Sequence, residues 1–150
     1  MEFEGDVLLR DTNDGGEIVI ENGEILCDKG LRTAVYLSLL GGNKGDDGIS
    51  DSETWWGNKL RDIPENEILR SRFQAIIRGK PLTSKNLKDA EEAANDDLKW
   101  LIDEGIADKV ECEIFTENRN FINLSVNILK ESKTVTAETF CFEWGGNDGI

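Results

Sequence analysis

The chain has 150 residues and a formal net charge of -14, from 31 acidic and 17 basic residues, and it contains no histidine. This length fits one domain over residues 1–150, and the acidic balance, without a basic cluster, disfavours nucleic acid as a partner. Without histidine, Ser-His-Asp and Cys-His nucleophilic sites, His-ligated zinc and His-ligated haem are excluded.

The cysteines and the N-terminus indicate a cytoplasmic chain. Cys27, Cys112 and Cys141 are widely spaced and form no Cys-x-x-Cys pair. They are typical of reduced, mostly buried residues, with one disulfide pair as the alternative. No apolar run approaches the ~20 residues of a membrane span, and the acidic start MEFEGDVLL differs from a signal peptide. We therefore expect no membrane partner.

Short strands are predicted for the first thirty residues. DVLLRD precedes the turn cluster TNDGG, and EIVIENGEILCD has Asn-Gly at 22–23 between two alternating apolar segments. That arrangement is the strongest short-range signal for a hairpin. Ile18 and Ile20 share one face of the hairpin, and Ile25 and Cys27 of the returning strand are expected to meet them.

Two helices are predicted on either side of a polar loop. The segment 30–40, GLRTAVYLSLL, is dense in apolar residues, as in a mostly buried helix that two glycines end. The loop over about 41–54 is too short for a linker between domains. Pro64 then fits the first turn of a second helix, PENEILRSRFQAIIRG, which has one apolar stripe before Gly79.

A third, longer helix is predicted after Pro81. Thr83 or Ser84 can cap its N-terminus, and Gly105 closes it. Trp100 lies on its apolar side and is expected in the core, while the outer face is charged and solvated. The apolar stripe consists of Leu87, Ala90, Ala94, Leu98, Leu101 and Ile102.

From residue 108 onward the hydrophobic period changes to two. KVECEIFTE, FINLSVNILK and TVTAETFCFEW are predicted to form an antiparallel meander, because only short polar turns separate them. The inward face of the middle strand is Ile122, Leu124, Val126 and Ile128. The two faces of the last strand are Phe140, Phe142 and Trp144 on one side and Val135, Ala137 and Cys141 on the other. An edge strand with two apolar faces would bind a partner; helices that cover its second face are an equal alternative.

The order of these elements predicts an α+β fold. An antiparallel β-sheet, made of the N-terminal hairpin and the C-terminal three-stranded meander, is packed with about three helices. The prediction follows from the change of hydrophobic period along the chain, from two to 3.6 and back to two.

No motif for catalysis or for a cofactor stands out. The sequence lacks GxxxxGK[ST], GxGxxG and a nucleophile elbow, and with 31 acidic residues a carboxylate pair has little diagnostic value. The acidic loop around Gly48 lacks the bidentate glutamate and one early ligand of a calcium loop. We assign no catalytic residue, cofactor or metal ligand, and we favour a binding or structural module over an enzyme.

Two adjacent tryptophans, Trp55 and Trp56, follow the acidic loop in GDDGISDSETWWGN. Adjacent side chains point in different directions, so one small core cannot easily bury both rings. We expect one ring to anchor the loop and the other to dock on a neighbouring protein, with burial of both as the alternative. The candidate partner-binding residues are Trp55, Trp56, Phe140, Phe142 and Trp144.

The segments, taken in order, resemble the phage Mu family of gene product 46, a baseplate protein of contractile tails. The resemblance rests on LRTAVYLSLLGGNKGDDGISDSETWWGN, ILRSRF, DDLKWLIDEGIADKVECEI and INLSVNILK. Family features fall on Leu31 to Leu40, Trp55-Trp56-Gly57, Trp100-Leu101 and Gly105. The similarity extends over roughly residues 5–145.

The resemblance implies a baseplate wedge subunit, located where the tail sheath begins to polymerise. Its partners would be other baseplate wedge proteins and the tail sheath, in a virion tail assembled in the host cytoplasm. The isolated chain would be a monomer or weak oligomer. Sheath subunits of such tails join by exchanged β-strands, so a free sheet edge could template the first ring.

The family is distantly similar to gene product 25 of T-even phages and to its type VI secretion counterpart, a branch often labelled lysozyme. The Glu-Pro-Arg motif of that branch is absent, and the nearest segment is Ile63-Pro64-Glu65. No residue role is therefore carried over. Two alternatives stay open: a peptidoglycan-cleaving tail lysozyme that uses paired carboxylates, and a cytoplasmic adaptor with the same fold.

Overall fold

The computed structural model describes residues 5–12, 15–28, 30–41, 62, 64 and 71–145. The N-terminal strands are β1 (Asp6–Val7), β2 (Leu9–Thr12), β3 (Gly15–Ile18), β4 (Ile20–Glu21), β5 (Glu24–Ile25) and β6 (Cys27–Asp28). The helices are α1 (Arg32–Leu40), α2 (Arg72–Gly79), α3 (Ser84–Asp97) and α4 (Trp100–Asp103). The C-terminal strands are β7 (Lys109–Thr116), β8 (Phe121–Lys130) and β9 (Lys133–Glu143).

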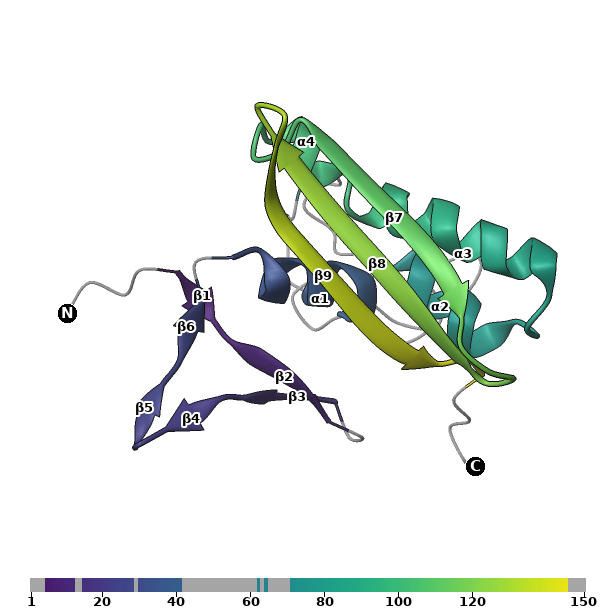
Figure 1. The fold of residues 1–150 in the computed structure, drawn as a ribbon, viewed down its shortest axis with the longest axis horizontal. Helices are drawn as coiled ribbons and strands as arrows, with labels where there is room; N and C mark the ends of the chain where they lie inside the picture. Colours follow the sequence, from purple (N-terminus) through teal and green to yellow (C-terminus); the bar gives the residue numbers. More distant parts are fainter. Residues whose placement is uncertain are drawn as a thin grey trace.

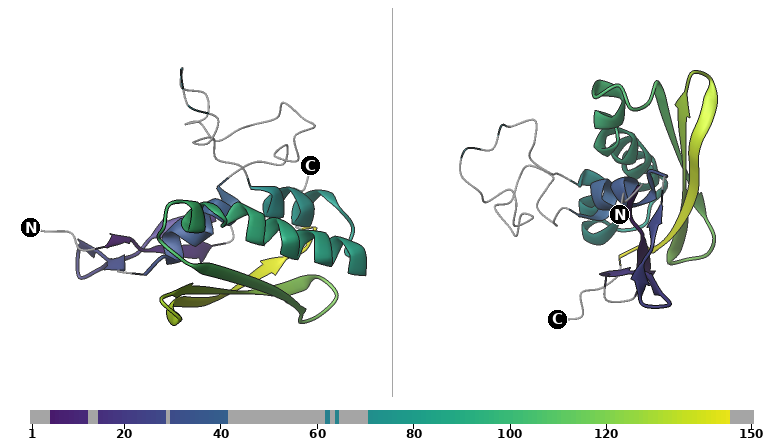
Figure 2. Two further views of the ribbon diagram at one scale, coloured as in Figure 1. Left: turned by 90° about the horizontal axis from the view of Figure 1, so that it is seen from above. Right: turned by 90° about the vertical axis from the view of Figure 1, so that its left-hand side faces the viewer.

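The larger part of the molecule has two layers. Strands β7, β8 and β9 form an antiparallel sheet in that order, and the helices cover one face of it (Figures 1 and 2). A sheet of this kind buries one face and exposes the other, so its strands alternate apolar and polar residues. The predicted α+β class and the C-terminal meander are confirmed.

The hydrophobic core lies between the sheet and the helices. The four apolar side chains of β8 that were predicted to face inward, Ile122, Leu124, Val126 and Ile128, are all 0% exposed. Ala90, Ala93 and Ala94 of α3 are buried in the same cluster, and such small side chains let a helix approach a sheet closely.

Aromatic rings join α2 to β9. The ring of Phe73 meets the ring of Phe142 edge-on, with 5.3 Å between the centroids. Phe142 in turn stacks on Phe140, with 6.0 Å between the centroids. Both arrangements are favourable for aromatic pairs, and they hold the last strand against the helix layer.

The helices begin and end partly as predicted. Thr83 caps α3, because its Oγ1 accepts a hydrogen bond from the backbone N–H of Asn86 at 3.1 Å. The predicted second helix, 64–79, is confirmed from Arg72 onward only. Pro64 is not helical and Ser71 has a non-helical backbone, so the predicted continuous helix is wrong there, and residues 65–70 lie outside the described residues. The predicted third helix is divided by a turn at 98–99 into α3 and α4.

That turn changes which residues of the last helical segment are buried. Leu101 remains fully buried, whereas Ile102 and Trp100 are 39% and 38% exposed. The prediction that Ile102 belongs to the apolar stripe and that Trp100 is a core residue is therefore wrong. The Nε1 of Trp100 donates a hydrogen bond to the Oγ of Ser38 at 2.9 Å, which ties α4 to α1.

The N-terminal strands do not join the meander. They form three separate two-stranded ladders, β1 with β6, β2 with β3 and β4 with β5, which diverge from one another in Figure 1. The predicted hairpin is confirmed in β4 and β5, where Ile20 pairs with Ile25. The expectation that Ile18 and Cys27 meet within it is wrong, because Ile18 pairs with Leu9 and Cys27 pairs with Val7. The turn residues Asn22 and Gly23 have φ angles of 52° and 82°, as a type I′ turn requires. We call residues 6–28 the three-armed sheet.

The three-armed sheet is held to the helix layer by its connection to α1. The Oγ1 of Thr33 donates a hydrogen bond to the carbonyl oxygen of Val7 at 2.7 Å. Among the described residues, none of the three-armed sheet belongs to the buried core cluster. The larger part is therefore stabilised by its buried core, whereas the three-armed sheet depends on strand pairing and on its connection to α1.

Replacing Leu124 by alanine should lower the free energy of unfolding by about 3 kcal/mol, because a cavity would replace a fully buried side chain. Urea unfolding followed by circular dichroism measures the change. Val135→Ala serves as the control, since Val135 is half exposed, and it should cost less than about 1 kcal/mol. Equal losses in the two variants would contradict this account of the core.

Candidate functional site

The sheet of β7, β8 and β9 has two edges, and an edge strand can bind a strand of another protein. Such binding uses backbone N–H and C=O groups that have no partner within the sheet. Which of the two edges is available therefore decides where a partner strand can be added.

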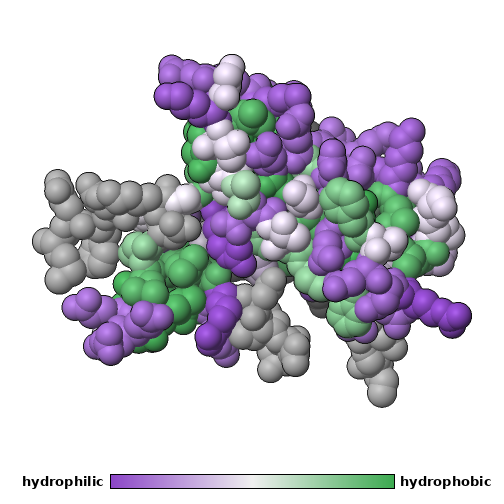
Figure 3. Space-filling view, viewed as in Figure 1, coloured by the Kyte–Doolittle hydropathy of each residue, from purple (hydrophilic) through white to green (hydrophobic). Residues whose placement is uncertain are grey.

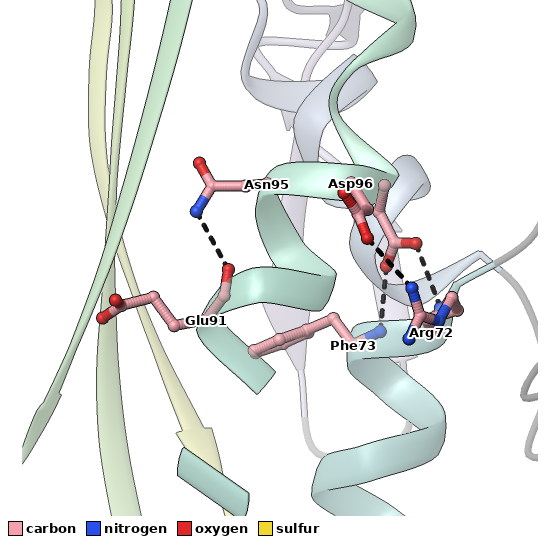
Figure 4. Close-up of polar contacts among 6 residues, drawn as sticks. Arg72, Phe73, Glu91, Asn95 and Asp96 are labelled. Carbon is pink, nitrogen blue, oxygen red and sulfur yellow. Dashed lines mark hydrogen bonds and ion pairs between the residues drawn. The ribbon is translucent and has the colours of Figure 1, made fainter. Parts of the chain in front are cut away.

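Side chains of α3 occupy the edge at β7. The backbone N–H of Ile114 donates to Oε2 of Glu91 at 2.9 Å, and the N–H of Cys112 donates to Oδ1 of Asn95 at 3.1 Å. Figure 4 shows Glu91 and Asn95 pointing from α3 toward the strands. Because polar side chains satisfy these backbone groups, the edge is closed at Cys112 and Ile114, and we call β7 the closed edge.

The edge at β9 is open. Strand β9 pairs with β8 along one side, and in the described part of the chain no group outside β8 forms a hydrogen bond with its backbone between Thr136 and Glu143. A register shift opposite Ile128 and Leu129 leaves Val135 as an extra residue, which is a β-bulge. Bulges interrupt strand pairing, so the open edge consists of residues 136–143.

The outward face of β9 is exposed to solvent. Val135 is 50% exposed, and Ala137, Thr139 and Cys141 are also exposed. The alternative in which helices cover both faces of this strand is therefore wrong for the described residues. The meander has a buried inner face, an exposed outer face and one open edge.

The aromatic residues proposed to bind a partner lie on the inner face. Phe140, Phe142 and Trp144 are buried in the core, and the Nε1 of Trp144 donates to the carbonyl oxygen of Lys80 at 2.8 Å. In the isolated chain these side chains fix the position of β9. Their part in partner binding stays a prediction. Trp55 and Trp56 lie outside the described residues.

The N-terminus of α1 holds the middle of the open edge from its inner side. Arg32 forms an ion pair with Glu138, and its guanidinium lies over the ring of Phe140, 5.1 Å from the centroid. The backbone N–H of Leu31 donates to Oγ1 of Thr136 at 3.3 Å. Arg32 was not among the residues predicted to be functional. Arg32 pairs with Glu138, which is distant in the sequence, and no local sequence pattern indicates such a pair.

A half-buried carboxylate fixes α2 against α3. The two carboxylate oxygens of Asp97 accept hydrogen bonds from the backbone N–H groups of Arg72 and Phe73, at 3.1 and 2.9 Å. Asp96 forms an ion pair with Arg72 at 2.9 Å (Figure 4). Burial raises the pKa of Asp97 from 3.8 to about 7, while the two N–H donors and the Arg72 charge act in the opposite direction.

The three cysteines are free thiols. Burial, with smaller contributions from the charges of Glu91 and Asp97, raises the pKa of Cys112 to about 12, which keeps this thiol protonated and unreactive. Cys27 is half-buried and Cys141 is exposed, so burial was predicted correctly for Cys112 alone. Within the described ranges no cluster of metal-ligating side chains occurs, and no helix is long and apolar enough to cross a membrane.

The fold and its surface define a small α+β protein whose sheet has one closed and one open edge. Over residues 31–135 the chain matches the family described as Phage protein GP46, and it belongs to that family. It is 25% identical over 139 residues to the Mu-like prophage FluMu protein gp46 of Haemophilus influenzae, across 93% of this chain and 97% of that protein. No solved structure matches. The resemblance to gene product 46 is thereby confirmed, and the chain is a phage protein.

Replacing Glu91 and Asn95 by alanine should open the edge at β7. The N–H groups of Ile114 and Cys112 would lose their acceptors, at a cost of about 1–3 kcal/mol each where they stay shielded from water. Amide hydrogen exchange should become faster at these two residues and stay unchanged in β8. Glu92→Ala, on the exposed face of the same helix, is the control; faster exchange there too would contradict the assignment.

Asp97 should make the chain less stable as the pH rises. Its pKa is higher in the folded chain, so its stabilising contribution is complete below the unfolded pKa near 3.8 and is lost as the pH rises through about 7. The change should be at most about 4 kcal/mol. Urea unfolding across this pH range should give a flatter profile for Asp97→Asn than for the wild type. Parallel profiles would show that Asp97 does not titrate in this range.

Proposed function

We propose that the chain is a structural component of the baseplate of a contractile phage or prophage tail, a wedge subunit near the start of the sheath. It acts by binding other wedge proteins and the sheath, and it is not an enzyme. Membership of the phage GP46 family and the similarity to a Mu-like prophage gp46 support this placement.

The open edge of β9 is the observation that carries the proposal. Among the described residues, Glu91 and Asn95 close one edge of the sheet, and nothing outside β8 bonds the backbone of the other edge over residues 136–143. A protein that needed protection from strand pairing would be expected to block both edges. The asymmetry is consistent with a partner strand that adds to one side of the sheet only.

The composition of the open edge also suits a partner strand. Exposed edge strands are commonly protected by lysine, proline or inward-pointing charges. Glu138 is such an inward-pointing charge, because it lies opposite the buried Val126, but Arg32 pairs with it, and residues 136–142 contain no lysine or proline. On the exposed face, Ala137 and Thr139 are small, so an incoming backbone would meet little steric hindrance. Strand addition at this edge would obtain affinity from backbone hydrogen bonds.

The alternative of a peptidoglycan-cleaving lysozyme has weaker support. A general acid of that kind needs a raised pKa and a proton free to donate. Among the described residues Asp97 has such a pKa, but its two oxygens accept the backbone N–H groups of Arg72 and Phe73. We expect purified protein to release no reducing ends from cell-wall polysaccharide.

The two edges can be compared with one matched substitution. Thr139→Lys places a charge on the open edge, and Thr116→Lys makes the same change on the exposed end of β7. Tagged wild-type protein and Thr116→Lys should recover tail proteins from cells that express the tail genes, whereas Thr139→Lys should lose most of that recovery. Thermal unfolding should confirm that both variants fold.

Other outcomes separate the parts of the proposal. Equal recovery by all three proteins would show that the open edge is not the binding site, while leaving the tail role in place. Recovery of no tail protein by the wild type, under conditions where tails assemble, would contradict the tail role itself. Release of reducing ends by the wild-type protein would instead support the lysozyme alternative.

A further inference from the structure

The three-armed sheet meets at a junction of three residues. The N–H of Leu8 donates to the carbonyl oxygen of Leu26 at 2.9 Å, that of Leu26 to Val19 at 3.0 Å, and that of Val19 to Leu8 at 3.0 Å. These three hydrogen bonds form a closed ring. Each arm is one of the two-stranded ladders, so the junction holds all three arms in a single layer.

The face of this layer that carries the residues beside the junction is apolar; the junction residues Leu8, Val19 and Leu26, which alternate with them, are half-buried. The three residue pairs beside the junction are Val7 with Cys27, Leu9 with Ile18, and Ile20 with Ile25. Paired residues of an antiparallel ladder point to the same side, and residues two apart along a strand share a face. The six side chains thus gather around the junction, and Figure 3 shows an apolar surface over these strands.

In the part of the chain that the structure describes, this apolar face is exposed at its three isoleucines, while Val7, Leu9 and Cys27 are half-buried. Ile18, Ile20 and Ile25 are 52%, 61% and 50% exposed, although isoleucine is among the residues most often buried. Domains normally pack a second layer on an apolar sheet face. A two-stranded ladder by itself is only marginally stable in water and needs a packed apolar face. Because this face is exposed, the arms gain little stability from it.

The arms carry an acidic rim. Asp6, Glu17, Glu21 and Glu24 are exposed there, against a single arginine, Arg10, which lies 3.6 Å from Glu17. Glu21 and Glu24 stand directly opposite each other in the β4–β5 ladder. Like charges at opposed positions destabilise a ladder. The β4–β5 arm therefore contains a destabilising pair of like charges, and such local violations are expected at functional sites.

We infer that the apolar face of the three-armed sheet is a docking surface for an apolar segment of another protein that carries lysine or arginine beside its apolar residues. The isoleucines would supply the contact area, and the basic residues would relieve the repulsion between Glu21 and Glu24. This surface is separate from the open edge of β9, and the inference does not depend on the baseplate role.

Charge decides against a second copy as the occupant. Two identical faces would bring two acidic rims together, in a chain whose net charge is -14. Like charges placed across an interface oppose association, whereas a basic partner is complementary. The acidic rim therefore favours binding to a different, basic protein over self-association.

Selection from a displayed library of random peptides against the full-length chain tests the inference. Enriched peptides should combine apolar residues with flanking lysine or arginine, and calorimetry should show that their affinity falls as the salt concentration rises. Ile20→Glu with Ile25→Glu should weaken binding by at least about tenfold. Phe115→Glu on β7 is the matched control, because Phe115 is 55% exposed, and it should bind like the wild type.

A second variant guards against loss of folding. Glu21→Gln with Glu24→Gln removes the opposed charges and keeps the apolar face, so it should raise the stability of the arm while it weakens binding of the basic peptides. A variant that is more stable but binds less well cannot be explained by unfolding. Amide exchange in β4 and β5 measures the stability of the arm.

Three outcomes would overturn the inference. Enriched peptides without an excess of basic residues would contradict the role of the rim, and undiminished binding to the isoleucine variant would place the site elsewhere. Failure to enrich any peptide, with a wild-type dimer in sedimentation that the isoleucine variant abolishes, would make a second copy the occupant. In each case the β9 edge remains to be judged by its own experiment.

Discussion

The structure depends on the burial of one face of a three-stranded sheet. A meander this small has no second sheet, so helices must supply the other half of the core. The alanines of α3 permit close approach to the strands, and Phe73 of α2 packs on Phe142 of β9. Once the inner face is covered in this way, the outer face and the two edges remain as the surfaces of the sheet, and their treatment determines how the protein can interact.

The two edges are treated differently because the helices are not placed symmetrically. Helix α3 runs beside β7, so its polar residues Glu91 and Asn95 reach the outer backbone groups of that strand. Near β9, the N-terminus of α1 contributes Arg32, which pairs with the side chain of Glu138, and among the described residues α1 forms no hydrogen bond with the backbone of the strand. The same layer of helices therefore closes one edge and supports the other. The position of the helices thus decides both how the core is packed and which strand edge is available to a partner.

Much of the fold could be predicted from hydrophobic periodicity. The alternation in β8 and the Asn-Gly turn at 22–23 determine local geometry directly, and both predictions are confirmed. Trp100 was wrongly placed in the core, because a turn within the predicted helix is not visible in a pattern of apolar residues. The three-armed sheet was missed for a related reason: strands of two to four residues are too short for a clear period, and β1 pairs with β6 across the whole segment.

The candidate site was harder to predict than the fold. The last strand was correctly identified as an edge strand, but its two apolar faces left open whether helices cover its outer side, and the structure shows that side exposed. That β7 is closed could not be predicted, because it requires the tertiary position of two side chains on α3. Phe140 and Phe142 were selected as large apolar residues at an edge, but size and apolarity are also what a core requires. Sequence gives the chemistry of a residue, and the packing of the layers decides which side it faces.

Photo-cross-linking during tail assembly tests the central claim most directly. A photoreactive amino acid at position 137 would lie on the exposed face of the open edge, and one at position 113 would lie on the corresponding face of β7. The account predicts cross-links to another tail protein from position 137 and few or none from position 113. Incorporation of the chain into tails with cross-links from position 113 alone would contradict it.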